Sequence, residues 1–227
     1  MALKDFKDNF PKKIFKSRYL PKWIKFVVII FTNWFFQGFL QMDVGEKVFK
    51  IILETILFLL TYVILSTLRI NSIIIVILFT HTLYWIFFGN VFLLLKNLHL
   101  TKIPINVFYE YTKRLHRRVQ NENSINGAAA FGSLAKKTIT TSSDLDVILI
   151  RENGIINWLI SCSFIVKERF FALLNRFPID IYLLDNLQKF ERINVDEIPI
   201  ILSDKKGLLR SKYKIFQNFE DNDQCHF

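Results

Sequence analysis

The sequence predicts an α+β domain, a mixed sheet flanked by helices, preceded by an all-α membrane-embedded hairpin region. Residues 26–95 hold only six charged residues in seventy positions, which is too few for a soluble domain of that size. From about residue 100, β-rich runs alternate with helical stretches, as in a sandwich around one sheet. We therefore expect a basic N-terminus and membrane-embedded helices in residues 1–99, the α+β domain in residues 100–217, and a polar tail in residues 218–227.

The net charge of +10 is concentrated on both sides of the apolar block. Residues 1–25 carry eight basic groups against two acidic ones, and residues 96–120 carry six against one. Basic clusters that flank apolar segments are typical of the cytoplasmic side of membrane proteins and of binding to anionic lipids. This arrangement favours the lipid bilayer as partner and makes nucleic acid, which a basic chain otherwise suggests, an unlikely one.

Three apolar stretches fill the first region: Trp23–Leu40, Val48–Leu68 and Ile73–Leu95. The third is long enough to cross a hydrocarbon core of about 30 Å, and the second is nearly as apolar. Because both basic clusters should be cytoplasmic, the number of crossings between them should be even. We expect Val48–Leu68 and Ile73–Leu95 to form a hairpin joined by Arg69–Ser72, with the first stretch interfacial or re-entrant. The alternative is that all three cross, which would put residues 96–227 outside.

Two polar residues in the apolar block and the two cysteines do not indicate a functional site. His81 and Asn90 lie within the third apolar stretch, where hydrogen bonding between helices is a commoner explanation than a transport path. Cys162 and Cys225 form neither a disulfide framework nor a metal-binding spacing, so we expect one buried thiol and one thiol in the tail.

The elements of the second region follow from residue periodicity. Helical spacing of apolar residues predicts a helix over Val107–Gln120, and Ile155–Asn175 is long enough for another. A turn is expected at Asp204–Gly207. The β-rich runs that predict strands are Ala128–Phe131, Ser143–Ile150, Pro178–Leu184 and Ile198–Leu202.

The segment most informative about chemistry runs from Ala130 to Leu149. Gly132 and Ser133 follow a short apolar strand and begin a helix, where glycine lets the backbone approach an anion and N–H groups attract phosphate. After ten further residues, Asp144 and Asp146 begin a strand, from which their side chains project on the same face. Two adjacent carboxylates repel each other unless a cation neutralises them, and hard oxygen ligands suit Mg²⁺ bound together with substrate phosphates.

A third carboxylate could complete this site. Asp180 lies on another apolar strand, and it joins the pair if that strand is adjacent. Each feature alone is common: a Gly-Ser pair is usually a turn, and Asp-x-Asp occurs in calcium loops and metal-dependent glycosyltransferases. Their order along the chain, with strands on each side, is much more specific.

The segment resembles the signature of the polymerase-β-type nucleotidyltransferase superfamily. That signature is an apolar residue, Gly, Gly or Ser, about ten residues, then Asp-apolar-Asp-apolar. The matching residues are Phe131, Gly132, Ser133, Asp144, Leu145, Asp146 and Val147, with Asp180 in the position of the third catalytic carboxylate.

The resemblance is greatest to the small "minimal" nucleotidyltransferases, and it covers roughly residues 105–210. Their motif often continues Gly-Ser-x-Ala-Arg-Gly. Here Ala135 matches, Lys136 replaces Arg and Lys137 replaces Gly. Lysine in place of glycine at position 137 affects the loop conformation expected from the motif. The two lysines could still face a triphosphate.

The resemblance implies a metal-assisted transfer and a nucleotidyltransferase-type sheet. Asp144, Asp146 and Asp180 would be catalytic and would bind Mg²⁺, two ions by this resemblance, with Mn²⁺ as a possible substitute. The nucleotide-binding residues would be Gly132, Ser133, Lys136 and Lys137. An acceptor hydroxyl would attack the α-phosphorus of an NTP, such as ATP, and pyrophosphate would leave.

We therefore expect a membrane-anchored, multi-pass nucleotidyltransferase whose catalytic domain lies on the cytoplasmic face, where NTP is supplied. Its acceptor would be at the membrane: a lipid head group, a lipid-linked sugar or a membrane protein. Two alternatives stay open: a non-catalytic nucleotide-binding regulator of a membrane partner, and a small Asp-x-Asp glycosyltransferase.

Overall fold

The computed structural model describes residues 21–39, 42–70, 72–89, 91–97, 102–185 and 198–219. The chain divides into two compact units, Met1–Val91 and Phe92–Phe227. The basic groups of residues 1–20, and the tail from residue 220 with Cys225, lie outside the described residues.

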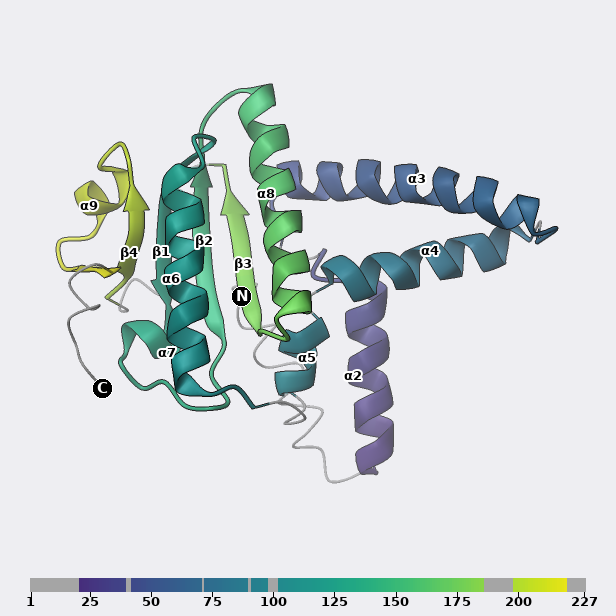
Figure 1. Ribbon diagram of the computed structural model, residues 1–227, viewed down its shortest axis with the longest axis horizontal. Coiled ribbons are helices and arrows are strands. Elements are labelled where there is room, and N and C mark those ends of the chain that lie inside the picture. Colours follow the sequence, from purple (N-terminus) through teal and green to yellow (C-terminus); the bar gives the residue numbers. More distant parts are fainter. Residues whose placement is uncertain are drawn as a thin grey trace. The chain divides into compact units, whose positions relative to one another are not determined.

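The first unit is helical, with α2 (Lys22–Phe36), α3 (Val44–Thr67) and α4 (Ile73–Phe88) (Figure 1). Helix α3 has 24 residues and rises about 36 Å at about 1.5 Å per residue. Few of its side chains are buried, unlike those of a core helix in a soluble protein. Within the described ranges, α3 is the one helix that is long and apolar enough to cross a membrane.

The second crossing of the expected hairpin is not supported. The stretch Ile73–Leu95 is interrupted: α4 ends at Phe88 and α5 (Val91–Asn97) follows. The 16 residues of α4 rise about 24 Å, less than the thickness of about 30 Å of a hydrocarbon core. Gly89, whose N–H donates to the carbonyl of Trp85 at 2.9 Å, ends the helix, because glycine has a low helix propensity. The apolar stretches and the flanking basic clusters predicted a multi-pass chain, and both patterns overlooked this break.

Polar side chains connect the three helices of the first unit. The pairs are His81 Nδ1 with Glu54 Oε1 at 2.5 Å, Trp34 Nε1 with Thr82 Oγ1 at 3.1 Å, and Trp85 Nε1 with Asn33 Oδ1 at 2.7 Å. Hydrogen bonding between helices was the expected role of His81, and these contacts confirm it. Asn90 lies outside the described residues.

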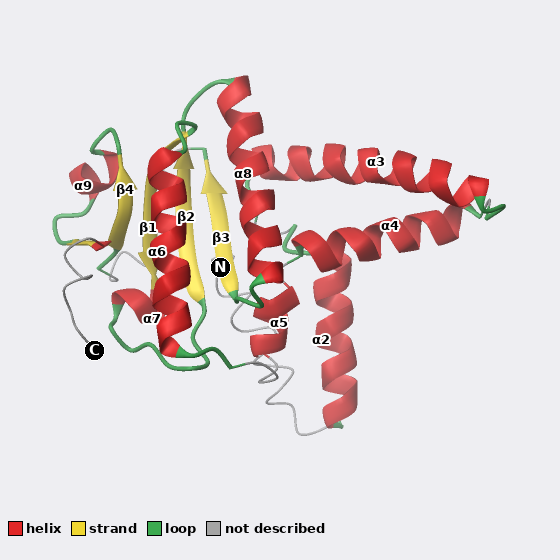
Figure 2. Ribbon diagram, viewed as in Figure 1, coloured by secondary structure: helices red, strands yellow, loops and turns green. Residues whose placement is uncertain are grey.

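The second unit is an α+β domain with a mixed five-stranded sheet (Figure 2). Its elements after α5 are α6 (Ile105–Asn121), β1 (Ile125–Phe131), α7 (Gly132–Ala135), β2 (Leu145–Arg151), α8 (Ile155–Leu174), β3 (Ile179–Leu184), β4 (Ile200–Asp204), α9 (Leu208–Lys212) and β5 (Gln217–Asn218). The strand order is β3-β2-β1-β4-β5. Strand β1 is antiparallel to β2 and β4, whereas β2 pairs with β3, and β4 with β5, in parallel.

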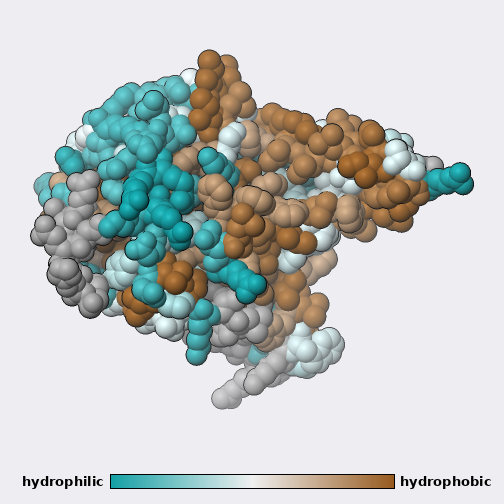
Figure 3. All heavy atoms as spheres, viewed as in Figure 1, coloured by the Kyte–Doolittle hydropathy of each residue, from teal (hydrophilic) through white to brown (hydrophobic). Residues whose placement is uncertain are grey.

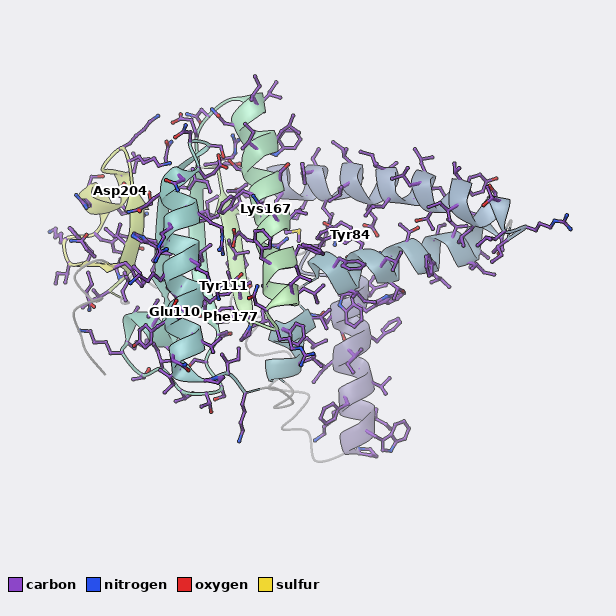
Figure 4. The ribbon with its side chains drawn as sticks, in the orientation of Figure 1. Tyr84, Glu110, Tyr111, Lys167, Phe177 and Asp204 are labelled. Atoms are coloured by element: carbon purple, nitrogen blue, oxygen red, sulfur yellow. The ribbon has the colours of Figure 1, made fainter. Side chains whose placement is uncertain are left out.

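Helices α6 and α8 cross one face of this sheet (Figure 1). The ring of Tyr111 on α6 stacks on Phe177, with centroids 3.9 Å apart (Figure 4). Arg118 on α6 donates two hydrogen bonds to the Glu168 carboxylate on α8, at 2.6 and 2.7 Å. Burial raises the pKa of the Glu168 carboxyl, and the Arg118 guanidinium opposes this shift. The charge-assisted pair therefore joins the two helices, and the aromatic stack joins α6 to the segment between α8 and β3.

The opposite face carries a smaller hydrophobic cluster, in which Ile148 and Ile150 of β2 pack with Leu209 of α9 and with Tyr213. Helix α9 was not expected from the sequence. It begins after the predicted turn, and the Asp204 carboxylate accepts hydrogen bonds from the backbone N–H groups at its start, at 3.2 and 2.9 Å. Burial raises the pKa of the Tyr213 phenol to about 12.

Candidate active site

Two of the three predicted aspartates are neighbours in the sheet. Asp146 on β2 is in register with Asp180 on β3, and the strands are parallel. Register partners on adjacent strands, about 4.8 Å apart, project from the same face. Asp180 is buried, and its Oδ2 accepts a hydrogen bond from the Tyr182 hydroxyl at 2.7 Å. The parallel pairing of β2 with β3 thus brings together carboxylates that are 34 positions apart in the sequence.

The glycine of the motif lies directly against this pair. Phe131 on β1 is opposite Asp146, so Gly132 follows at the edge of the site. Gly132 has φ +68°, a left-handed conformation that side chains rarely adopt. A side chain here would also place its Cβ 2.5 Å from Oδ2 of Asp146. Both the backbone conformation and the close contact therefore require glycine at this position.

Helix α7 ends in a tight turn at Lys137. The N–H of Lys137 donates to the Leu134 carbonyl at 3.2 Å, and the N–H of Thr138 donates to the Ser133 carbonyl at 2.9 Å. These two bonds form a Schellman motif, in which the residue after the C-cap is left-handed and usually glycine. Lys137 occupies that position with φ +54°. The position where the minimal nucleotidyltransferases have glycine thus keeps a conformation suited to glycine, although lysine stands there.

The Ser133 hydroxyl is buried at the start of α7. Among the residues that the structure describes, none forms a hydrogen bond with its Oγ. A buried hydroxyl without a partner costs free energy. A ligand oxygen at this place would satisfy it.

The remaining predicted residues lie on the segment between α7 and β2. Lys136 and Lys137 are exposed in the turn after α7. Asp144 is half-buried immediately before β2, two positions from Asp146. The chain that enters the domain also meets this segment, because the N–H of Ile103 donates to the Thr141 carbonyl at 2.8 Å.

A metal site is only partly assembled. Within the described ranges, no group of three His, Cys, Asp or Glu side chains is arranged to hold a metal ion. Asp146 and Asp180 nevertheless provide adjacent carboxylates, which is the donor chemistry that Mg²⁺ prefers. The residues present therefore fit a divalent cation through this pair, with Asp144 next to it along the chain.

Sequence reasoning missed the contribution of Tyr182. Its hydroxyl holds one oxygen of Asp180, which limits the directions in which that carboxylate can face. The alternation of side chains along a strand could have identified it, because Tyr182 follows Asp180 by two positions and so lies on the same face. The pairing itself needed the structure.

No model of a known protein family matches this chain, and no curated protein sequence is significantly similar to it.

Proposed function

We propose that this protein is a membrane-anchored, Mg²⁺-dependent nucleotidyltransferase that moves a nucleoside monophosphate from an NTP to an acceptor hydroxyl and releases pyrophosphate. One observation supports this most directly: Asp146 and Asp180 are register neighbours, and Gly132 lies against Asp146. A Gly-Ser turn beside a carboxylate pair is the arrangement that the sequence motif predicts for this superfamily.

Each residue has a role in the proposed reaction. Asp144, Asp146 and Asp180 hold divalent cations, and Tyr182 orients Asp180 through its hydroxyl. Gly132 brings the backbone near the phosphates, and the Ser133 hydroxyl gains the hydrogen-bond partner that it lacks among the described residues. When bound there, Mg²⁺ would supply positive charge that offsets the negative charge developing in the transfer. The acceptor hydroxyl loses its proton to solvent and its oxygen bonds to the α-phosphorus, while the bond from that phosphorus to the oxygen bridging to the β-phosphorus breaks and pyrophosphate leaves.

The membrane anchor determines where the acceptor is found. Helix α3 is long and apolar enough to cross a bilayer, and the second unit begins at Phe92, directly after the first unit ends at Val91. Ile103, at this entry to the domain, binds the segment that leads to Asp144. This supports an acceptor at the membrane, such as a lipid head group, a lipid-linked sugar or a membrane protein. Because NTP is cytosolic, the domain is on the cytoplasmic face in this proposal.

The test is nucleotide transfer by the full chain in native membranes. Membranes are incubated with Mg²⁺ and each α-labelled NTP, and both pyrophosphate release and label on lipid or protein are measured. We expect Asp146→Asn and Asp180→Asn each to lower the rate about 100-fold or more, since metal-assisted charge stabilisation contributes several kcal/mol. Asp185→Asn is the matched control. It makes the same change just after β3, where Asp185 pairs with Arg151 at 2.6 Å, at the end of the strand away from Asp180.

Three results would contradict the proposal. Undiminished transfer by Asp146→Asn would mean that the carboxylate pair takes no part in the reaction. Binding of ATP without pyrophosphate release would favour a nucleotide-binding regulator, and hydrolysis of sugar nucleotides instead would favour an Asp-x-Asp glycosyltransferase.

A further inference from the structure

The outer face of α8 is apolar over the first turns of the helix and again at its last residue. The helix turns its inner side, including Cys162, Ile165 and Ala172, toward the sheet. The opposite side should be polar in a domain surrounded by water. Instead, its large exposed side chains are Ile155, Ile156, Leu159, Ile160 and Leu174, and Ile156 is 73% exposed. Figure 3 shows hydrophobic residues over the first turns of this helix.

A basic row runs beside this face on α6. The exposed positions of α6 include Arg114 and Arg117, with Lys113 half-exposed and Glu110 as the acidic residue among them. Arg118 faces α8, where it binds Glu168, and Arg114 lies one turn before it on the same side of α6. Lys167 adds a cation on the outer side of α8 itself (Figure 4). The surface therefore combines an apolar strip with a basic border.

We propose that the outer face of α8 lies on the surface of an anionic lipid bilayer. An apolar strip that enters the interface and cations that meet the lipid head groups are the two components of interfacial helix binding. The same chain carries α3, which is long and apolar enough to span a bilayer. A spanning α3 would keep the domain next to the lipid surface on which this face of α8 would lie. A second copy of the domain is a poorer occupant, because two basic rows would face each other and repel.

This docking is separate from nucleotide transfer. Helices α6 and α8 cover one sheet face, whereas Ile148 and Tyr182, which share their face with Asp146 and Asp180, pack on the opposite side. Docking through α8 therefore leaves the aspartate pair uncovered. Loss of docking need not abolish pyrophosphate release, and loss of Asp146 need not abolish docking.

The test uses the full chain reconstituted in vesicles of mixed phosphatidylcholine and phosphatidylserine. Cys225 is replaced by Ser, and buried Cys162 is retained. A polarity-sensitive fluorophore is attached at Ile156→Cys or, as a matched control, at Ile215→Cys. Ile215 is 67% exposed and precedes Phe216, which packs against the cluster on the other sheet face. We expect a quencher carried by the lipids to quench the probe at position 156 and not the probe at position 215.

The basic row gives a second measurement. The double variant Arg114→Ser, Arg117→Ser should lower the ratio of docked to undocked domain about 30-fold in anionic vesicles, since each surface cation contributes about a fivefold factor. It should have little effect in vesicles of phosphatidylcholine alone.

Two outcomes would overturn the proposal. In the first, aqueous iodide quenches the probe at position 156 as strongly as the probe at position 215, which would mean that water covers the face. In the second, the probe at position 156 is protected from both iodide and the lipid quencher, which would mean that protein covers it, whether the chain's own apolar helices or a second copy. Pyrophosphate release, measured on the same vesicles, reports the state of the aspartate site independently.

Discussion

The two faces of the sheet in the second unit differ in what covers them. The face under α6 and α8 is closed by the stack of Tyr111 on Phe177 and by the ion pair between Arg118 and Glu168. The other face carries the small hydrophobic cluster and, next to it, the Asp146–Asp180 pair. Strand β2 supplies both faces from alternating positions.

The side chains of this one strand differ in burial between its two faces. Odd-numbered residues of β2, such as Val147 and Leu149, are fully buried, whereas Asp146 keeps partial exposure on the other side. Two neighbouring carboxylates repel each other, so the helix-covered face must supply the stability that the aspartate face does not. Changes on the two faces should therefore have separable effects.

We expect the largest effect on stability at the ion pair between α6 and α8. In Arg118→Ala, the Glu168 carboxylate is left buried without its guanidinium, which should destabilise the protein by about 3–5 kcal/mol. Thermal unfolding of the purified full chain measures this. Arg117→Ala, an exposed neighbour on the same helix, should change stability by less than about 0.5 kcal/mol. Equal effects of the two variants would mean that the pair does not hold the helices together.

On the other face, the sharpest change is Gly132→Ala. It imposes a strained φ and a contact with Asp146, so we expect about 2–4 kcal/mol of destabilisation and loss of nucleotide transfer. Gly207→Ala separates the two causes, because Gly207 has a similar φ of +66° and open space around it. That control should lose only about 1–2 kcal/mol and retain transfer. If the two variants lose the same stability and both retain transfer, the contact with Asp146 contributes to neither.

The smallest expected effect is a gain in stability at the end of α7. Lys137→Gly relieves a left-handed conformation and should stabilise the protein by about 1 kcal/mol. Lys136→Gly is the matched control, since Lys136 has φ −81° and glycine there should destabilise by about 0.5–1 kcal/mol. Melting temperatures of the two variants should therefore move in opposite directions. A shift of both in the same direction would mean that backbone strain at Lys137 is negligible.

Much of the fold could be predicted from the sequence because local patterns determine it. The apolar periodicity located α6 and α8, and the β-rich runs located β1 to β4 within a few residues. The short elements α9 and β5 were missed. Helix α9 has only five residues, and it depends on capping by Asp204 rather than on a long apolar repeat.

The sequence predicted which residues belong to the candidate site but not how they are arranged. The order of the motif identified Gly132, Ser133 and the three aspartates as candidates. The sequence around β2, however, does not indicate which strand pairs with it. The contact of Gly132 with Asp146 and the hydrogen bond from Tyr182 likewise depend on how β1, β2 and β3 are aligned.

The apolar helical part and the α+β part could be predicted from the sequence, because hydropathy and charge patterns are local properties of the chain. Tertiary structure alone decided that Asp180 lies beside Asp146, because strand pairing joins residues distant in sequence. It also decided which side of α8 remains apolar and exposed, since a helix's outer face is defined only once its inner face has packed against the sheet.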